Sequence, residues 1–500
     1  MTDLLLALEE RMYDNAPAIT FGRRTLSYRD LRIRMHSVAA GLQRHGMREG
    51  ERVLFSVRPG IDAVVLALAI VKAGATVVFA DPGAGETLFR ARMALAEPRW
   101  VAAEPLLYAV SRGPARAFAR RRGIDLPDYA SIVPDAEFMH AGIRLPGVPR
   151  GSLSLARLER QRGFPAPVAE DTDALIVFTS GTTETPKAVV HTRRTLGSGL
   201  GDIGAALALS RGQRLVTDQL MIGIPALIAG AHWVMPGYGT NPGAQPKHFL
   251  RLLADAEATF LTPASMSVVL DTLDGRTLPR LRLVALGGAP VLHPLLRRIR
   301  AAMPNAAIRA IFGMTEVLPV AIADGIEKLE RDPADGDWLG RIASSVLASV
   351  DDNELRLSGP GLARRYLHES HELQTLATGD LVRIDGDELT MLGRKKDMLI
   401  RDRTNIYPAL YEPIIASLPG VREACIVGVP DEIGDDRVVL AIVGDDETPG
   451  LAQRVERSLP GLIDHAALPD AVVEIGELPR AGRQRKPDRS ALVQHLRQCL

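Results

Sequence analysis

A loop rich in hydroxyl groups follows an apolar run in the stretch ALIVFTSGTTETPKAVVH, residues 174–191. Small residues surround one glycine in this loop, and a lysine follows them: Thr179, Ser180, Gly181, Thr182, Thr183 and Lys187. Short hydroxyl donors, free backbone N–H groups and an ammonium group together can hold a polyphosphate. The string is not a GxxxxGK[ST] loop, because its lysine follows a proline. The loop therefore predicts a phosphate site, and an ordinary surface loop is the alternative.

Lysine is scarce in this chain, which has sixty lysine and arginine residues in total. The seven lysines are Lys72, Lys187, Lys247, Lys328, Lys395, Lys396 and Lys486. A compact ammonium group on a flexible stem differs chemically from a planar guanidinium group. The lysines that remain are therefore candidates for positions that arginine cannot fill, and Lys187 is one of them.

The composition excludes several classes of function. The sixty basic residues are balanced by sixty acidic ones, so we expect no nucleic-acid partner, which would favour a net positive charge. The longest apolar run, 63–71, is far shorter than the roughly 20 residues of a membrane-spanning helix. The N-terminal stretch lacks the pattern of a signal peptide. Two cysteines, Cys425 and Cys499, give neither a disulfide framework nor a metal-binding spacing. We therefore expect a cytoplasmic protein.

Five hundred residues are too many for one hydrophobic core, so we expect at least two domains. Apolar spacing predicts helices at 26–46 and 63–74, with strands at 52–57 and 76–79. Such alternation predicts an α/β fold in which helices cover parallel sheets. Residues 345–400 differ, because short alternating runs with tight turns predict antiparallel strands there.

The C-terminal part of the chain predicts a separate unit of helices and strands. A turn followed by charged residues at 393–397 is a candidate domain boundary. The predicted segments after it are 405–418, 422–429 and 437–443, followed by a helix at 450–458.

Several motifs, in order along the chain, resemble those of the adenylate-forming superfamily, which includes acyl-CoA synthetases, adenylation domains and luciferases. FTSGTTETPKAVVHT resembles its phosphate loop, and the other matching stretches are LSYRDL, VKAGATVVFADP, ALGGAP, FGMTE, ATGDLVRIDGD, GRKKDMLIRDRTNIYP and KPDRSAL. Each stretch alone has an ordinary structural interpretation, as a turn or a surface charge. Their occurrence together, in the order of the family and over nearly the whole chain, supports the resemblance.

The resemblance implies a fold and a division into domains. It implies a large N-terminal domain, 1–393, built of two helix-covered sheets and a small β-barrel subdomain. A hinge at 394–397 would follow, with Lys396 as its pivot. A small mobile α+β domain, 398–500, would carry the catalytic lysine.

The resemblance also implies roles for particular residues toward ATP and Mg²⁺. The phosphate loop, Thr179 to Thr183 with Lys187, would hold the β- and γ-phosphates. Thr315 would contact the α-phosphate, Glu316 would coordinate Mg²⁺, and Lys486 would meet the substrate carboxylate. Asp380, helped by Arg394, would accept hydrogen bonds from the ribose hydroxyls. The residues that would enclose the adenine are Gly288, Ala289, Pro290, Phe312, Gly313 and Met314.

An acid substrate would occupy a pocket whose expected lining is Asp218, Met221, Gly223, Ser265 and Leu318. The sequence departs from the family pattern at three places. Glu184 and Ala188 stand where the family usually has glycine, so the phosphate loop carries an unusual carboxylate. Arg403 stands where many relatives have glycine beside the thiol channel. The segment 217–231 lacks the histidine of many acyl-CoA synthetases, and Asp218 could instead imitate an aspartate that binds an amino group.

A narrower likeness divides the chain. The stretches ADPGAG, AEPRW and FGMTEVLPVA resemble the branch that contains the olefin β-lactone synthetases, whereas GRKKDM and NIYP resemble acyl ligases. We expect an ATP-dependent ligase that adenylates a carboxylic acid and transfers it to CoA. The alternatives are a β-lactone synthetase, a stand-alone amino or aryl acid adenylating enzyme, and a non-catalytic nucleotide-binding relative. A carrier protein is a further possible acceptor, and a monomer or homodimer is expected.

Overall fold

The computed structural model divides into two compact units. Unit 1 comprises 1–241, 314–319 and 359–374, and unit 2 comprises the remaining residues. This division does not coincide with the boundary expected at 394–397, which stays a prediction. The structure describes residues 3–80, 85–121, 126–133, 135–169, 171–178, 187–367, 369–401, 404–430, 436–444, 450–460, 462–463, 467–481 and 486–497.

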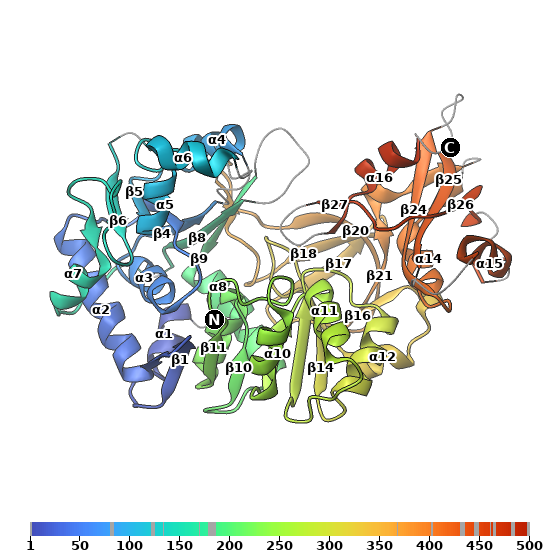
Figure 1. Cartoon of the computed structure of the whole chain (residues 1–500), viewed down its shortest axis with the longest axis horizontal. Helices are drawn as coiled ribbons and strands as arrows, with labels where there is room; N and C mark the ends of the chain where they lie inside the picture. The colour runs from blue at the N-terminus through green and yellow to red at the C-terminus, as the bar shows by residue number, and fades with distance from the viewer. Residues whose placement is uncertain are drawn as a thin grey trace. The chain divides into compact units, whose positions relative to one another are not determined.

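Unit 1 contains a mainly parallel sheet with helices packed on it, as the alternation of elements predicted (Figure 1). Its central strands are almost wholly buried and rich in valine, which is typical of strands covered on both faces. The strands pair in the order β19 (Arg365–Tyr366), β9 (Ala188–Thr192), β8 (Asp173–Phe178), β4 (Thr76–Phe79), β3 (Arg52–Ser56), β5 (Trp100–Ala103), β6 (Glu137–His140) and β7 (Leu153–Ser154). A second series in this unit is β10 (Arg214–Val216), β11 (His232–Met235), β1 (Pro17–Phe21) and β2 (Arg24–Ser27).

The helices of unit 1 follow the predicted pattern closely. The helix expected at 26–46 begins at Tyr28, because the side chain of Ser27 caps it by accepting from the backbone of Asp30. The helices are α1 (Leu4–Glu9), α2 (Tyr28–Arg44), α3 (Ile61–Lys72), α4 (Glu86–Ala96), α5 (Pro105–Val110), α6 (Gly113–Arg121), α7 (Leu155–Arg160), α8 (Arg193–Leu207) and α9 (Leu220–Ala229). Across the described ranges, no helix combines the length and apolar character needed to cross a bilayer.

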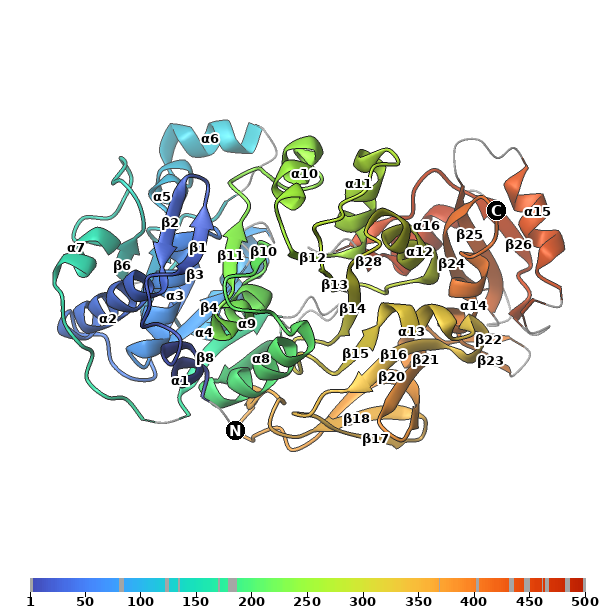
Figure 2. The ribbon, with the colours of Figure 1, turned by 90° about the horizontal axis from the view of Figure 1, so that it is seen from below.

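Unit 2 contains a series of strands that changes from parallel to antiparallel (Figure 2). The order is β12 (Ala258–Leu261), β13 (Leu283–Gly287), β14 (Ala307–Phe312), β15 (Ala321–Asp324), β16 (Asp337–Ile342), β21 (Glu388–Arg394), β20 (Leu376–Asp385), β18 (Glu354–Ser358) and β17 (Leu347–Asp351). The strands expected as a small β-barrel are thus antiparallel neighbours whose pairing continues into β15 and β14. The associated helices are α10 (Pro246–Ala254), α11 (Pro263–Leu273), α12 (His293–Ala302) and α13 (Gly325–Glu330).

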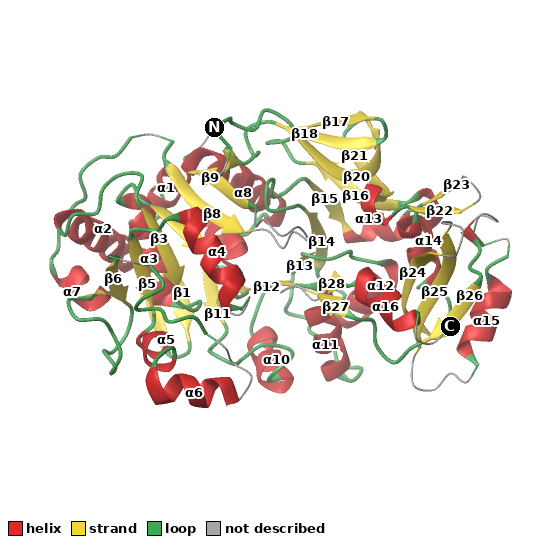
Figure 3. Cartoon of the chain, turned by 90° about the horizontal axis from the view of Figure 1, so that it is seen from above, coloured by secondary structure: helices red, strands yellow, loops and turns green. Residues whose placement is uncertain are grey.

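The C-terminal part of unit 2 has its own core around β24 (Val421–Pro430), β25 (Asp436–Gly444) and β26 (Ala471–Glu474) (Figure 3). Successive residues of β25 alternate between two apolar clusters, as the pleat of a strand requires. Val438, Leu440 and Ile442 pack with α14 (Pro408–Ile415) and α15 (Leu451–Ser458), whereas Val439, Ala441 and Val443 pack with α16 (Arg489–Leu496). The shorter elements are β22 (Leu399–Arg401), β23 (Thr404–Ile406), β27 (Arg480–Ala481) and β28 (Lys486–Pro487), with 3-10 turns at Pro333–Asp335 and Lys395–Asp397.

Candidate active site

Thr315 and Glu316 occupy the tip of a tight turn in unit 1. The backbones of Met314 and Val317 exchange two hydrogen bonds, of 2.9 and 3.2 Å, which bring the residues on either side of the tip together. From the adjacent strand β9, Nε2 of His191 donates to the carbonyl oxygen of Thr315 over 2.7 Å. The sequence predicted the chemical roles of Thr315 and Glu316, and the structure shows how their backbone is held.

Tyr366, which no sequence motif indicated, contacts Glu316, the predicted metal ligand. Its hydroxyl donates to Oε1 of Glu316 over 2.9 Å. The Nζ atom of Lys187 lies over the same ring, 5.4 Å from its centroid, which is within the range of a cation–π interaction. Burial and the charge of Glu316 raise the pKa of Tyr366 above its usual value, so the hydroxyl stays a donor at neutral pH. The structure therefore brings Lys187 and Glu316, both predicted from sequence, to one tyrosine.

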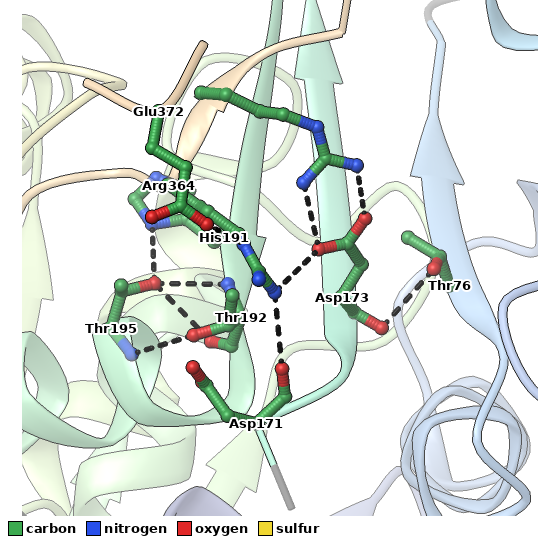
Figure 4. A network of polar contacts seen from close by, with 9 residues as sticks. Thr76, Asp171, Asp173, His191, Thr192, Thr195, Arg364 and Glu372 are labelled. Carbon is green, nitrogen blue, oxygen red and sulfur yellow. Dashed lines mark hydrogen bonds and ion pairs between the residues drawn. The ribbon is translucent and has the colours of Figure 1, made fainter. Parts of the chain in front are cut away.

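A network of ion pairs fixes the segment that carries Tyr366 (Figure 4). Arg365 forms a two-point contact with Asp173 at the start of β8, with distances of 3.1 and 2.5 Å. Arg364 lies 3.6 Å from the same carboxylate and pairs with Glu372 at 2.7 Å. Bidentate arginine–carboxylate pairs are both strong and directional. These contacts secure β19 against the edge of the sheet.

In unit 2, Asp380 and Arg394 face each other on neighbouring strands, β20 and β21. The Asp380 carboxylate is fully buried, and its Oδ1 atom lies 2.7 Å from Nε of Arg394. The Arg394 side chain is 42% exposed, so the guanidinium group reaches from the buried acid toward solvent. The structure thus pairs the two residues that were expected to serve the ribose together.

The stretch of β20 before Asp380, where the register with β18 shifts, is held by two polar side chains. The backbone N–H of Asp380 donates to the hydroxyl of Thr378 at 3.0 Å, and that of Gly379 donates to Glu354 at 2.9 Å. The hydrogen bond from Gly379 lowers the pKa of Glu354, and Lys395 at 3.3 Å acts in the same direction. Gly379 has a φ of +73°, a conformation that favours glycine. These hydrogen bonds therefore fix the backbone from which the Asp380 side chain extends.

The predicted adenine-side residues of unit 2, and Ser265 of the expected acid pocket, lie at or just beyond the carboxyl ends of adjacent parallel strands. The pairing of β12, β13 and β14 places Leu261 opposite Leu286 and Gly287 opposite Ile311. Ser265 follows β12, the turn 288–290 follows β13, and Phe312 ends β14 just before Gly313. Ligands of open α/β sheets bind outside these carboxyl ends. The structure thus gathers residues that lie far apart in the sequence.

The expected acid-pocket residues of unit 1 have different surroundings. Asp218 is exposed and accepts from the side chain of Gln219 at 2.8 Å. Met221 is half-buried at the start of α9. A Cβ on Gly223 would lie 2.2 Å from the Trp233 ring, so this glycine serves close packing of helix on strand.

Leu318 lies against α8, where a Cβ added to Gly199 would come within 2.2 Å of its carbonyl oxygen. Ala188, one of the departures from the family pattern, is buried in β9. The other departures, Glu184 and Arg403, lie outside the described residues, as do Thr179, Ser180, Gly181, Thr182 and Thr183.

Only the backbone is described for Lys396 and Lys486. Lys486 pairs with Ala481 across β27 and β28, just before α16. The first residue of α16, Arg489, donates to both oxygens of Glu412 at 2.7 and 2.8 Å. The strand that carries Lys486 thus leads directly into an anchored helix.

Glu316 offers carboxylate oxygens, the type of ligand that Mg²⁺ prefers. Within the described ranges, no cluster of three or more His, Cys, Asp or Glu side chains could hold a metal ion. Mg²⁺ that accompanies a nucleotide needs only one or two protein carboxylates, because phosphates and water supply its other ligands. Glu316, a carboxylate whose side-chain donor is the neutral hydroxyl of Tyr366, fits this requirement.

Two family models match this chain. The model of the AMP-binding enzyme family matches residues 8–367, and the model of the AMP-binding enzyme C-terminal domain matches residues 411–485. The interval between the two matches contains the predicted hinge residue Lys396.

Two curated relatives and one solved structure illustrate the likeness. The olefin β-lactone synthetase of Stenotrophomonas maltophilia (strain K279a) is 28% identical over 92% of this chain and 90% of its own. The feruloyl-CoA synthase of an Amycolatopsis species is 27% identical over 89% of this chain and 90% of its own. The crystal structure of ATP-bound MatB from Rhodopseudomonas palustris shares the fold, with a TM-score of 0.79, 22% identity and 99% coverage of both chains. The chain therefore belongs to the AMP-binding enzyme family, as its motifs implied.

Proposed function

We propose that this enzyme activates a carboxylic acid with ATP, forming an acyl-adenylate and releasing pyrophosphate, and then transfers the acyl group to the thiol of CoA. The observation that carries the proposal is the convergence of Lys187 and Glu316 on Tyr366. A cation for phosphate oxygens and an acid for a metal ion are the two groups that a bound Mg²⁺–triphosphate requires.

In the first step, an oxygen of the acid's carboxylate forms a bond to the α-phosphorus of ATP. The bond between that phosphorus and the oxygen bridging to the β-phosphate breaks, and pyrophosphate leaves. Both reactants are anions, so positioned cationic groups are needed to lower the barrier. Lys187 and the hydroxyl loop 179–183 hold the outer phosphates, and Lys486 holds the attacking carboxylate near the α-phosphate.

Glu316 would hold Mg²⁺, which neutralises phosphate charge when bound. Asp380 accepts hydrogen bonds from the ribose hydroxyls, Arg394 orients its carboxylate, and the turn 288–290 with Phe312 encloses the adenine. Each assignment uses a group whose chemistry suits its ligand: carboxylate oxygens accept from hydroxyls, and an aromatic ring covers a flat base.

In the second step, the CoA thiol loses its proton to solvent and its sulfur forms a bond to the acyl carbon. The bond between that carbon and the AMP oxygen breaks, and AMP leaves with the bond electrons. Rotation of the C-terminal segment about Lys396 withdraws Lys486 and admits the thiol. A carrier-protein thiol is chemically equivalent and remains an alternative acceptor.

A second candidate function is favoured by the similarity to the olefin β-lactone synthetase over 92% of this chain. In that reaction the β-hydroxyl oxygen of the substrate attacks its own acyl carbon, and AMP leaves without a thiol. Both functions share the adenylation step and differ only in the nucleophile that follows.

A panel of carboxylic acids, matched in pairs with and without a β-hydroxyl, separates these functions. Pyrophosphate release and product mass are measured with ATP and Mg²⁺, in the presence and absence of CoA. A thioester formed from a plain acid supports the CoA ligase. AMP release only from the hydroxy acids, unaffected by CoA, supports the β-lactone synthetase. Absence of acid-dependent pyrophosphate release across the panel would contradict adenylation.

A further inference from the structure

We infer that Tyr366 is a positioning residue for the metal-nucleotide site: its hydroxyl orients the carboxylate of Glu316 while its ring steadies the ammonium group of Lys187. The inference rests on the proposed function, in which Glu316 binds Mg²⁺ and Lys187 binds phosphate. Tyr366 would act through these two groups rather than by touching the reacting atoms.

The hydrogen bond between Tyr366 and Glu316 suits a metal ligand. The hydroxyl engages Oε1 over 2.9 Å. An ionised carboxylate has about four acceptor sites on its two oxygens, so one hydroxyl leaves most of them for a cation. A hydroxyl donor is also neutral, whereas an arginine at the same place would cancel the negative charge. Tyr366 can therefore fix the geometry of Glu316 without weakening its attraction for Mg²⁺.

The tyrosine is itself rigidly placed. Its side chain is almost fully buried, and its backbone pairs with Val189 of β9. The backbone N–H groups of Arg364 and Leu367, on either side of it, donate to carbonyls of β9 at 2.8 Å. Asp173 accepts two hydrogen bonds from the adjacent Arg365. A side chain fixed in this way can transmit its orientation to a partner.

The pairing of β19 with β9 also connects Tyr366 to Lys187. Lys187 immediately precedes β9, and Val189, two residues later, is the strand partner of Tyr366. The Nζ atom lies 5.4 Å from the ring centroid, where the negative face of the ring attracts a cation. One residue thus sets the spacing between a phosphate-binding cation and a metal-binding acid, although it lies well over a hundred residues from the phosphate loop.

The test compares wild type with Tyr366→Phe, which removes the hydroxyl and keeps the ring. ATP binding is measured by titration calorimetry at a series of Mg²⁺ concentrations, without any acid substrate. We expect the Mg²⁺ concentration for half-maximal ATP binding to rise roughly tenfold, the factor that about 1.4 kcal/mol represents, because a hydrogen bond to a charged group is lost. ATP affinity at saturating Mg²⁺ should change little.

Tyr108→Phe is the matched control. Tyr108 is a buried tyrosine of the same unit, and its hydroxyl donates to the carbonyls of Val101 and Met139 at 3.1 and 3.0 Å. Its loss should reduce stability without moving the Mg²⁺ dependence. Asp173→Asn is a second probe, because it loosens β19 while leaving Tyr366 intact, and it should shift the Mg²⁺ dependence in the same direction by a smaller factor.

A double-mutant cycle decides whether Tyr366 acts through Glu316. In a Glu316→Gln background, Tyr366→Phe should add almost no further shift. An unchanged Mg²⁺ dependence in folded Tyr366→Phe, or an equal shift in both backgrounds, would overturn the inference. Because this readout needs no acid substrate, it is independent of the pyrophosphate assay that tests the proposed function.

Discussion

Two carboxylates that the motifs assign to nucleotide binding, Glu316 in unit 1 and Asp380 in unit 2, have contrasting partners within their own units. Asp380 is fully buried and paired with the guanidinium group of Arg394 on the neighbouring strand. Glu316 is half-buried and accepts from the neutral hydroxyl of Tyr366. Arg394 thus brings a positive charge directly to Asp380, whereas the hydroxyl of Tyr366 brings no charge to Glu316.

This difference predicts what each carboxylate binds. A neutralised acid remains a good acceptor but attracts cations weakly, which suits ribose hydroxyls. An acid with a neutral donor stays attractive to a cation, which suits Mg²⁺. The local charge of each pair therefore supports the role that the sequence motif implied.

The largest effect is expected from Lys486→Ala. This substitution should abolish most of the adenylation rate while leaving the ATP binding that involves Glu316 and Asp380. Acid-dependent pyrophosphate release should fall about 100-fold or more, because one positioned charge is lost from the transition state. ATP binding should stay within a few-fold of wild type, and a preformed acyl-adenylate should still react. The comparison uses single-turnover assays and calorimetry. Pyrophosphate release near the wild-type rate would remove Lys486 from the adenylation step.

Asp380→Ala should weaken the binding of the nucleoside part of ATP. Two hydrogen bonds to a charged acceptor are lost, each worth about 1.5–3 kcal/mol, so the KM for ATP should rise about 100-fold or more. The Mg²⁺ dependence at saturating ATP should be retained. The check is initial-rate kinetics over ATP concentration, and an unchanged KM would contradict the ribose assignment.

Glu316→Gln should weaken the binding of Mg²⁺, with a smaller effect on activity than the two substitutions above. Glutamine can still accept from Tyr366, so the change removes charge while keeping shape. We expect the Mg²⁺ concentration for half-maximal activity to rise about tenfold, comparable to losing one charge-assisted ligand. A metal titration that superimposes on wild type would remove Glu316 from the metal site.

The smallest effect is expected at His191, whose ring donates a hydrogen bond to the backbone of Thr315. Burial lowers the pKa of His191 below its ordinary value of 6.5. His191 therefore takes up a proton near pH 6.5 in the unfolded chain but not in the folded chain. As pH falls below that value, protonation of His191 in the unfolded state should reduce the free energy of unfolding. His191→Gln should cost about 1 kcal/mol at pH 7.5. It should also flatten the fall in stability between pH 7 and 5.

Urea unfolding of wild type and His191→Gln across this pH range tests the assignment. Equal slopes for the two proteins would show that His191 does not titrate on unfolding in this window. The corresponding support of Asp380, from Thr378 and Glu354, contains no histidine. The two carboxylates should therefore differ in how their supports respond to mild acid.

Periodicity and turn residues were sufficient to predict most elements that position the site. The strands around Asp380 and the alternation in unit 1 are confirmed, because both depend on local patterns of apolar and turn residues. The helix expected at 405–418 instead begins at Pro408, since 404–406 form β23. Proline at the first helical position fixes that start.

Other features depended on contacts between distant segments. Tyr366 reaches Glu316 only because 359–374 folds back onto β9, and no local pattern encodes that register. The scarcity of lysine pointed to Lys187, but it also marked Lys328, which is buried and paired with Asp337 at 2.5 Å. Lys72 likewise pairs with Glu9 at 2.7 Å. A lysine retained among arginines can therefore serve structure as readily as chemistry.

The most direct test of the contrast between the carboxylates is a set of calorimetric titrations with adenosine and with ATP at varied Mg²⁺, using wild type, Glu316→Gln and Asp380→Asn. We predict that Asp380→Asn weakens adenosine binding and leaves the Mg²⁺ dependence of ATP binding unchanged. Glu316→Gln should do the reverse. If both variants weaken adenosine and shift the Mg²⁺ dependence alike, the account of two carboxylates with separate ligands is contradicted.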